Sequence, residues 1–207
     1  MLLEKERREV VETCLFMQSS GLIVGTAGNV SIRVDDKVAI SPSGVPYETM
    51  TAEDVVVFSM DGERVDGILE PSSELPLHLS VYRETAAKAI THNHAPASTA
   101  LGLVVDEIPP SHYYSAMLGG IIRVAPYARN VTEALKDRSG ALMKNHGAIT
   151  IGPTVKKAAG LLPILEYVCE IHLRAMATGA PIALLSPEQM ADAKAAIADY
   201  GKQPNKK

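Results

Sequence analysis

The chain has 207 residues, of which 46% are apolar and 21% charged, and its 24 acidic residues outnumber its 20 basic ones. A chain of this length can fold as one domain and bury roughly 70% of the surface that its unfolded form exposes, so it needs no disulfide or zinc staple. The formal charge of −4 argues against nucleic acid as a partner, because proteins that bind it concentrate positive charge on one face.

Two further features predict a cytoplasmic protein without a membrane partner. No apolar run reaches the roughly 20 residues that cross a bilayer, and segment 1–6 carries charges where a secretory signal has its apolar stretch.

Cys14 and Cys169 lie in apolar helical patterns, and two thiols make no disulfide framework. We expect both thiols to be reduced and packed in the core.

The first part of the chain is expected to form a helix and three strands. Apolar residues at helical spacing predict a helix over 3–17 that ends at Gly21. Strand patterns at 30–34 and 38–41, separated by turn residues, predict a hairpin. A third strand is expected at 54–59.

Helices and strands continue to alternate in the rest of the chain. A second helix is expected from about Ser72 to Arg83, with Pro76 tolerated in its first turn. The last helix is predicted to begin with a capping box formed by Ser186 and Gln189. The remaining predicted elements are strands at 88–91, 121–124, 141–143 and 148–151, a long helix over 153–179 that contains Pro163, and an end of the last helix at Tyr200-Gly201.

This pattern predicts an α/β fold. We expect residues 1–207 to form a single domain with three α/β/α layers, in which helices cover a largely antiparallel central sheet.

Three of the six histidines stand where they could share a metal ion. His92 and His94 are two residues apart on an expected strand, so their side chains point to the same face, roughly 6.5 Å apart at the backbone. His146 lies between two strand patterns, and Gly147 after it permits a sharp turn. Three imidazoles suit a catalytic zinc-type site with one open position, although a His-x-His pair alone also occurs on surfaces and in cores.

Glu74 has two interpretations. A carboxylate in the first turn of a helix interacts favourably with the helix dipole, and a carboxylate beside a metal can act as a general base. His78, one helical turn further along, could be a partner of Glu74. We expect His78, like His112 and His172, to be structural or on the surface.

Three loops carry glycine and hydroxyl residues that could cradle an anion: 25–29, 41–44 and 72–73. Each is also ordinary turn chemistry, and none is followed by the Gly-Lys-Ser/Thr of a nucleotide-binding loop. Tyr113 and Tyr200 could donate a proton in a dry site or simply pack against the core.

Taken in order, these segments resemble the class II aldolase/adducin-head family, most closely its L-fuculose-1-phosphate aldolase branch. The resemblance implies a metal-dependent aldehyde-lyase that cleaves a ketose 1-phosphate reversibly to dihydroxyacetone phosphate and a short aldehyde such as lactaldehyde. The matching segments are 25–31, 41–44, 71–74, 92–94, 108–113, 125–128, 145–147 and 200–201.

The resemblance also implies residue roles. His92, His94 and His146 would hold Zn²⁺, with Mn²⁺ or Co²⁺ as possible substitutes. Glu74 would lie near or on the metal and move the proton of an enediolate, which requires surroundings that raise its proton affinity. The phosphate would be bound by Thr26, Gly28, Asn29, Ser43, Gly44, Ser72 and Ser73.

Subunit assembly is implied as well. The family is typically a homotetramer with sites at subunit interfaces. Tyr113 would serve the aldehyde-side oxygen across such an interface, and Tyr200 would close the site from a mobile tail that begins at about residue 200.

Other functions on the same scaffold remain open. A 4-epimerase, a dehydratase or a decarboxylase would use the same metal and phosphate contacts, although the epimerases usually carry aspartate where Glu74 stands. A non-catalytic adducin-like interaction domain would lose the metal histidines. Lys144 could in principle supply a Schiff-base amine, but we interpret it as an exposed charge.

Overall fold

A single nine-stranded sheet forms the centre of the molecule in the computed structural model, which describes residues 1–126 and 131–199. Its strand order is β4-β3-β2-β1-β5-β9-β8-β7-β6. Only β7 and β8 pair in parallel among the neighbouring strands described, and the other pairs are antiparallel. The strands are β1 (Gly28–Val34), β2 (Lys37–Ile40), β3 (Val56–Ser59), β4 (Arg64–Asp66), β5 (Ala89–Asn93), β6 (Glu107–Ile108), β7 (Ile122–Ala125), β8 (Gly140–Met143) and β9 (Gly147–Gly152).

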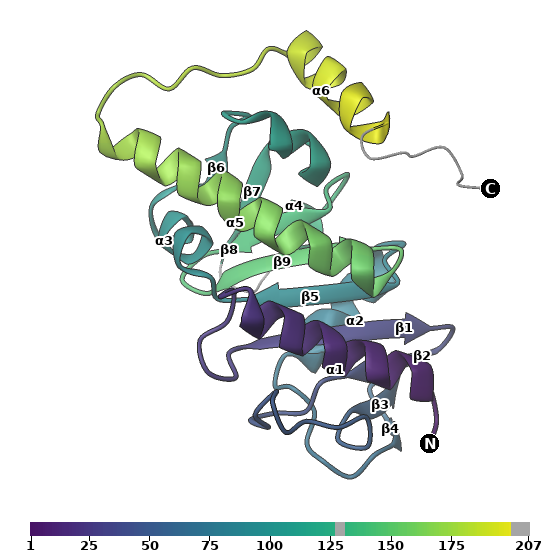
Figure 1. Ribbon diagram of the computed structural model, residues 1–207. Coiled ribbons are helices and arrows are strands. Elements are labelled where there is room, and N and C mark those ends of the chain that lie inside the picture. The colour runs from purple at the N-terminus through teal and green to yellow at the C-terminus, as the bar shows by residue number, and fades with distance from the viewer. Residues whose placement is uncertain (127–130, 200–207) are drawn as a thin grey trace, which may run out of the picture.

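Helices cover both faces of this sheet (Figure 1). On one face, α1 packs on β1, α5 packs on β5 and β9, and α3 contacts α5. On the other face, α2 and α4 contact each other and α4 packs on β7 and β8. The helical elements are α1 (Glu4–Ser19), α2 (Leu75–Glu84), α3 (Pro96–Val104), the 3-10 helix η1 (Tyr113–Leu118), α4 (Val131–Ala134), α5 (Val155–Ala177) and α6 (Pro187–Asp199). The expected three-layer α/β/α fold with a mostly antiparallel sheet is confirmed.

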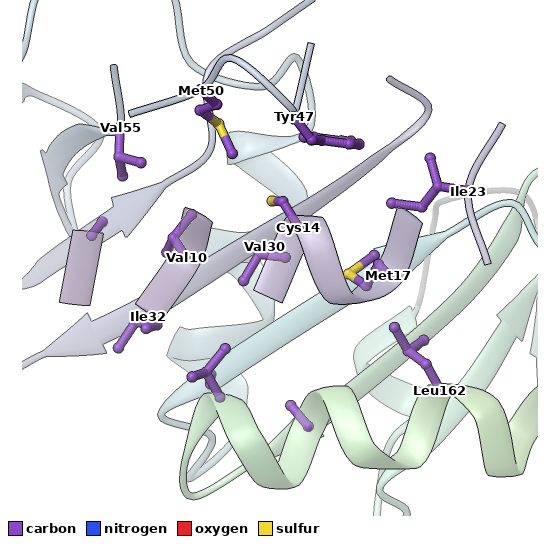
Figure 2. Packing of buried hydrophobic residues seen from close by; sticks show 14 of the residues in the cluster. Val10, Cys14, Met17, Ile23, Val30, Ile32, Tyr47, Met50, Val55 and Leu162 are labelled. Atoms are coloured by element: carbon purple, nitrogen blue, oxygen red, sulfur yellow. The ribbon is translucent and has the colours of Figure 1, made fainter. Parts of the chain in front are cut away.

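Alternation along the strands divides the apolar residues between the two faces. Val30 and Ile32 of β1 pack under α1 with Val10, Cys14 and Met17, as Figure 2 shows. Ser31 lies between them in sequence and so faces α2 on the other side, because neighbouring residues of a strand point to opposite faces. The central strands are therefore buried on both faces.

The start of α6 follows the expected capping rule. The backbone N–H of Ser186 donates to Gln189 Oε1 (2.8 Å) and that of Gln189 to Ser186 Oγ (3.2 Å), which confirms the capping box. The predicted end of α6 at Tyr200-Gly201, and the predicted tail, lie outside the described residues. Helix α5 continues through Pro163 as one helix.

Several short elements were not anticipated from the sequence: β4, β6, α3, η1 and α4. Helix α3 shows why, since its first turn is capped from another part of the chain. The carboxylate of Glu166 in α5 accepts the backbone N–H groups of Ala97 (2.6 Å) and Ser98 (2.9 Å). A cap supplied by a residue so distant in sequence leaves no local signal. Within the described residues, the helices are too short or too polar to cross a membrane.

Both cysteines are free and buried, and burial decides their reactivity. Burial raises the pKa of the Cys14 thiol to about 12, against a hydrogen bond with Ser41 that lowers it. Burial, and then the nearby Glu166 carboxylate, raise the pKa of the Cys169 thiol well above its ordinary value.

Because the thiolate is the reactive form, we expect iodoacetamide at pH 8 to alkylate the native protein at least about 100-fold more slowly than the unfolded chain. Mass spectrometry after timed labelling, with and without denaturant, measures both rates. Rapid labelling of either thiol in the native protein would contradict the packing described here.

Candidate metal centre and active site

Three imidazoles from separate segments converge at one end of the central strands. His92 lies on β5 and His94 follows directly after it, while His146 immediately precedes β9. Because β5 pairs with β9, with Asn93 opposite Ala148, the end of one strand lies beside the start of the other. The three ring centroids are 4.8, 4.8 and 4.9 Å apart. The convergence expected from the sequence is therefore present.

A close backbone approach at Gly147 makes this convergence possible. A Cβ atom at this position would lie 2.2 Å from the carbonyl oxygen of Asn93 and 2.8 Å from Cδ2 of His94. The turn before it contains Asn145 in the left-handed region, at φ 56°, a conformation that asparagine tolerates better than most residues. A larger residue than glycine would push the β8–β9 turn away from β5.

Glu74 is the fourth member of this group. It occupies the N-cap position of α2, and its side chain is 18% exposed. Its Oε1 lies 2.7 Å from Nε2 of His146, and its Oε2 lies 3.2 Å from Nε2 of His92. The four candidate ligand atoms all lie within 4.8 Å of one another. Three imidazole nitrogens and one carboxylate oxygen form a donor set that suits a divalent transition metal.

The tautomer of His92 favours metal binding. Its Nδ1–H donates to the carbonyl oxygen of Ala148 (2.8 Å), so in the neutral ring the lone pair is at Nε2, which faces Nε2 of His94 at 2.9 Å. Burial lowers the pKa of His92 to about 3, although the Glu74 carboxylate opposes this shift. A neutral imidazole oriented by a backbone carbonyl is the usual state of a metal-binding histidine.

Glu74 itself is ionised. Burial tends to raise the pKa of this carboxyl group, but the hydrogen bonds with His146 and Asn29, together with the charge that His92 would carry if protonated, outweigh it and lower the pKa to about 2. This direction is opposite to the raised proton affinity expected from the sequence. The reason is that the group is buried together with donors rather than among apolar side chains.

The three candidate phosphate loops meet beside Glu74. The backbone N–H of Ser43 donates to the carbonyl oxygen of Glu70 (2.9 Å), and that of Ser72 to the carbonyl oxygen of Ser41 (3.0 Å), which joins the second loop to the third. Ser72 Oγ accepts the backbone N–H of Glu74 (3.3 Å). The first loop enters β1, which pairs with β5 on the side away from β9.

Asn29, at the end of the first loop, contacts Glu74 directly. It lies opposite His92 in the pairing of β1 with β5, and its Nδ2 donates to Glu74 Oε2 at 2.7 Å. The amide nitrogen carries a second hydrogen that a phosphate could accept. The phosphate roles of Asn29, Thr26, Gly28, Ser43, Gly44, Ser72 and Ser73 stay predictions.

The two candidate tyrosines are placed differently. Tyr113 begins η1, is 47% exposed, and packs against the rings of His112 (4.8 Å) and Tyr114 (4.4 Å). Such an exposed ring is accessible to a neighbouring subunit. Its role across a subunit interface stays a prediction. Tyr200 lies outside the described residues.

His78 has more contacts with the site than the sequence indicated. It is fully buried on α2, and its Nε2 lies 2.6 Å from Asn29 Oδ1. Its position four residues after Glu74, on the same face of the helix, was the available signal. Of the two roles expected for His172, structural or on the surface, the structure shows the first: the ring is buried, with Nδ1 2.9 Å from Ser111 Oγ.

Known proteins resemble this chain along nearly its whole length. Residues 8–173 match the family model described as Class II Aldolase and Adducin N-terminal domain. The L-fuculose phosphate aldolase of Escherichia coli is 37% identical, over 95% of this chain and 96% of the relative. The 5-deoxy-D-ribulose 1-phosphate aldolase of Bacillus thuringiensis is also 37% identical, over 98% and 100%. A solved L-fuculose 1-phosphate aldolase superposes with a TM-score of 0.87 at 27% identity, covering 94% of this chain and 96% of that one.

The close approach at Gly147 generates a test. We expect Gly147→Ala to weaken Zn²⁺ binding at least about 10-fold and to destabilise the protein by about 1–3 kcal/mol, because the added methyl displaces the backbone that orients His94. Titration calorimetry and thermal unfolding measure the two effects.

Gly160→Ala is the matched control, since a Cβ atom there meets nothing within 4 Å. Alanine is the better helix former, so this change should stabilise α5 by up to about 1 kcal/mol and leave Zn²⁺ binding unchanged. Equal metal affinity in the two variants would show that the approach at Gly147 is not required.

Proposed function

The chain belongs to the class II aldolase and adducin family, and on that premise we propose that it cleaves a ketose 1-phosphate reversibly into dihydroxyacetone phosphate and a short aldehyde. It is a class II aldolase of the fuculose-phosphate aldolase type. The proposed substrate is similar to L-fuculose 1-phosphate, whose cleavage between C3 and C4 would release lactaldehyde.

The observation that carries the proposal is the position of the Glu74 carboxylate, 2.7 Å from one imidazole and 3.2 Å from another of the converging three. His92, His94 and His146 fit Zn²⁺, and Glu74 lies within reach of the same ion. When bound, Zn²⁺ would supply a Lewis acid that stabilises negative charge at the ketone oxygen. With that ion held by the imidazoles, the site would combine an electron sink with a base.

Glu74 is proposed to move the proton at C3. In cleavage, the C4 hydroxyl gives up its proton to the group on the aldehyde side and becomes the aldehyde oxygen, the C3–C4 bond breaks, its electrons form the enediolate of dihydroxyacetone phosphate, and a proton must then reach C3. In the reverse direction, the same carbon must lose that proton to a base. Glu74 is ionised, the form that accepts a proton, although its lowered pKa makes it a weaker base than the sequence led us to expect. At the N-terminal end of the helix it is held close to the proposed phosphate loops.

The rest of the substrate is assigned to the surrounding loops and to neighbouring chains. The phosphate is proposed to bind the backbone N–H groups and hydroxyls of the three loops beside Glu74. Tyr113 is proposed to serve the aldehyde-side oxygen from a neighbouring subunit of a homotetramer, and Tyr200 to help close the site. The exposed ring of Tyr113 is consistent with such an interface.

Other chemistries on this scaffold are less well supported. A Schiff-base mechanism would need Lys144 free to react, but its Nζ lies 2.6 Å from Asp106 Oδ1 in an exposed ion pair. The 4-epimerase alternative is disfavoured because Glu74 stands where those enzymes usually carry aspartate. The non-catalytic alternative does not explain four side chains arranged as one ligand group. Decarboxylase and dehydratase activities would use the same contacts and are tested by product analysis.

The role of Glu74 can be tested without any aldehyde. In D₂O, Zn²⁺-loaded protein should exchange one carbon-bound proton of dihydroxyacetone phosphate, and proton NMR follows that rate. We expect Glu74→Gln to slow the exchange at least about 100-fold, the usual contribution of a general base. Metal should remain bound through the three histidines.

Glu70→Gln is the matched control. It makes the same change in the same loop, at a carboxylate whose side chain is 84% exposed and paired with Arg64. Its exchange rate should equal that of the wild type. Undiminished exchange in Glu74→Gln would mean that another group is the base.

A second candidate substrate follows from the relative named a 5-deoxy-D-ribulose 1-phosphate aldolase. Both ketose phosphates would yield dihydroxyacetone phosphate, but cleavage of the five-carbon sugar would release acetaldehyde instead of lactaldehyde. We expect condensation with lactaldehyde to have the higher kcat/KM. A higher value with acetaldehyde would assign the five-carbon substrate, and absence of condensation with short aldehydes would contradict the aldolase proposal.

A further inference from the structure

A chain of four buried polar side chains ends on the Glu74 carboxylate. Tyr82 Oη lies 2.7 Å from Ser31 Oγ, which lies 2.6 Å from His78 Nδ1. On the other side of the same ring, His78 Nε2 lies 2.6 Å from Asn29 Oδ1. Asn29 Nδ2 in turn lies 2.7 Å from Glu74 Oε2. The chain passes from α2 to β1, back to α2, and again to β1 before it reaches Glu74.

The direction of every hydrogen bond in this chain follows from its last member. An ionised carboxylate only accepts, so Asn29 must donate through Nδ2 and present Oδ1 to His78. That oxygen also only accepts, so His78 must carry its proton on Nε2. In the neutral ring Nδ1 then accepts from Ser31, and Ser31 accepts from Tyr82. Every donor therefore points towards Glu74.

Burial excludes water as an alternative hydrogen-bond partner for these side chains. Ser31, His78 and Tyr82 are at most 1% exposed and Asn29 is 5% exposed, so water has little access to replace a missing partner. Burial also lowers the pKa of His78 to about 4, despite the opposing effect of the Glu74 carboxylate, and keeps the ring neutral. A lost donor would leave a buried acceptor unsatisfied.

His78 reinforces the orientation of the Asn29 amide that the Glu74 carboxylate requires. If the amide rotated by half a turn, Oδ1 would face the negatively charged Glu74 oxygen and Nδ2 would face an N–H donor. Both contacts would be repulsive, so the Nε2–H of His78 and the carboxylate jointly select one orientation. Neighbouring hydrogen bonds in such a chain also polarise one another.

We propose that His78 is a positioning residue for the aldolase reaction, acting through Asn29 to hold the Glu74 carboxylate in one orientation. The inference rests on the proposed function, in which Glu74 moves the proton at C3. Proton transfer depends steeply on the direction and distance of the base, and a misplacement of about 1 Å can cost about 100-fold in rate. His78 itself touches none of the reacting atoms.

Two amide substitutions at this position separate positioning from simple packing. The amide nitrogen of glutamine is as many bonds from Cβ as Nε2 of histidine, whereas that of asparagine corresponds to Nδ1. We therefore expect His78→Gln to donate to Asn29 and His78→Asn to fail to reach it. Tyr82→Phe removes the far end of the chain and leaves the bond between His78 and Asn29 in place.

Proton exchange of dihydroxyacetone phosphate in D₂O, its KM, bound Zn²⁺ and thermal unfolding are measured for each variant. We expect His78→Asn to lower the exchange rate about 10- to 100-fold, with KM and metal content within about 3-fold of wild type. His78→Gln and Tyr82→Phe should retain the rate within about 3-fold. The expected loss in rate follows from the cost of misplacing the base by about 1 Å.

Two results would overturn the proposal. Equal exchange rates in the asparagine and glutamine variants would show that the bond to Asn29 is not needed. A loss that follows the folded fraction or the metal content would assign His78 a purely structural role. If Glu74→Gln abolishes exchange while His78→Asn does not, this inference alone fails; if Glu74→Gln has no effect, the proposed function fails with it.

A measurement on the wild-type protein covers the case in which neither variant folds. Two-dimensional ¹⁵N–¹H NMR of the histidine rings distinguishes the two neutral tautomers. We expect His78 to be protonated at Nε2, with a slowly exchanging proton. Protonation at Nδ1 would break the deduced direction of the chain and overturn the proposal.

Discussion

The site depends on the position of β5 between β1 and β9. This pairing puts His92 opposite Asn29 on one side and opposite Ile149 on the other. It also brings the start of β9, with His146 just before it, beside His94. Because side chains alternate along a strand, a shift of one residue in either register would turn His92 away from Glu74. The glycine at position 147 then lets the two backbones approach closely enough for the rings to meet.

Burial alone does not set the charges around Glu74. A carboxylate in an apolar pocket holds its proton more tightly, and its pKa rises. Glu74 instead accepts a hydrogen bond from Asn29 and lies close to two imidazoles, and its pKa falls to about 2. Since burial keeps the His92 ring neutral, the group combines an anionic oxygen with a neutral imidazole whose Nε2 can bind a divalent cation.

Function within this family is decided at particular sites rather than by the fold. The relatives named above act on ketose phosphates that differ in the aldehyde part, although each covers nearly the whole of this chain. The proposed ligand group and phosphate loops would serve the cleavage of either ketose phosphate, so the residues that contact the aldehyde part would account for the difference. A fold shared by different activities cannot settle the substrate.

The sequence by itself determined the fold class, most of the strands and longer helices, and the candidate metal group. These depend on local signals: periodicity in strands and helices, a capping box, and two histidines whose spacing places both on one face of a strand. Tertiary structure decided the rest. The cap that Glu166 supplies to α3, the lowered pKa of Glu74, and the link from His78 to Asn29 all join residues distant in sequence. Such contacts depend on how helices pack on the sheet, and local sequence patterns do not indicate that packing.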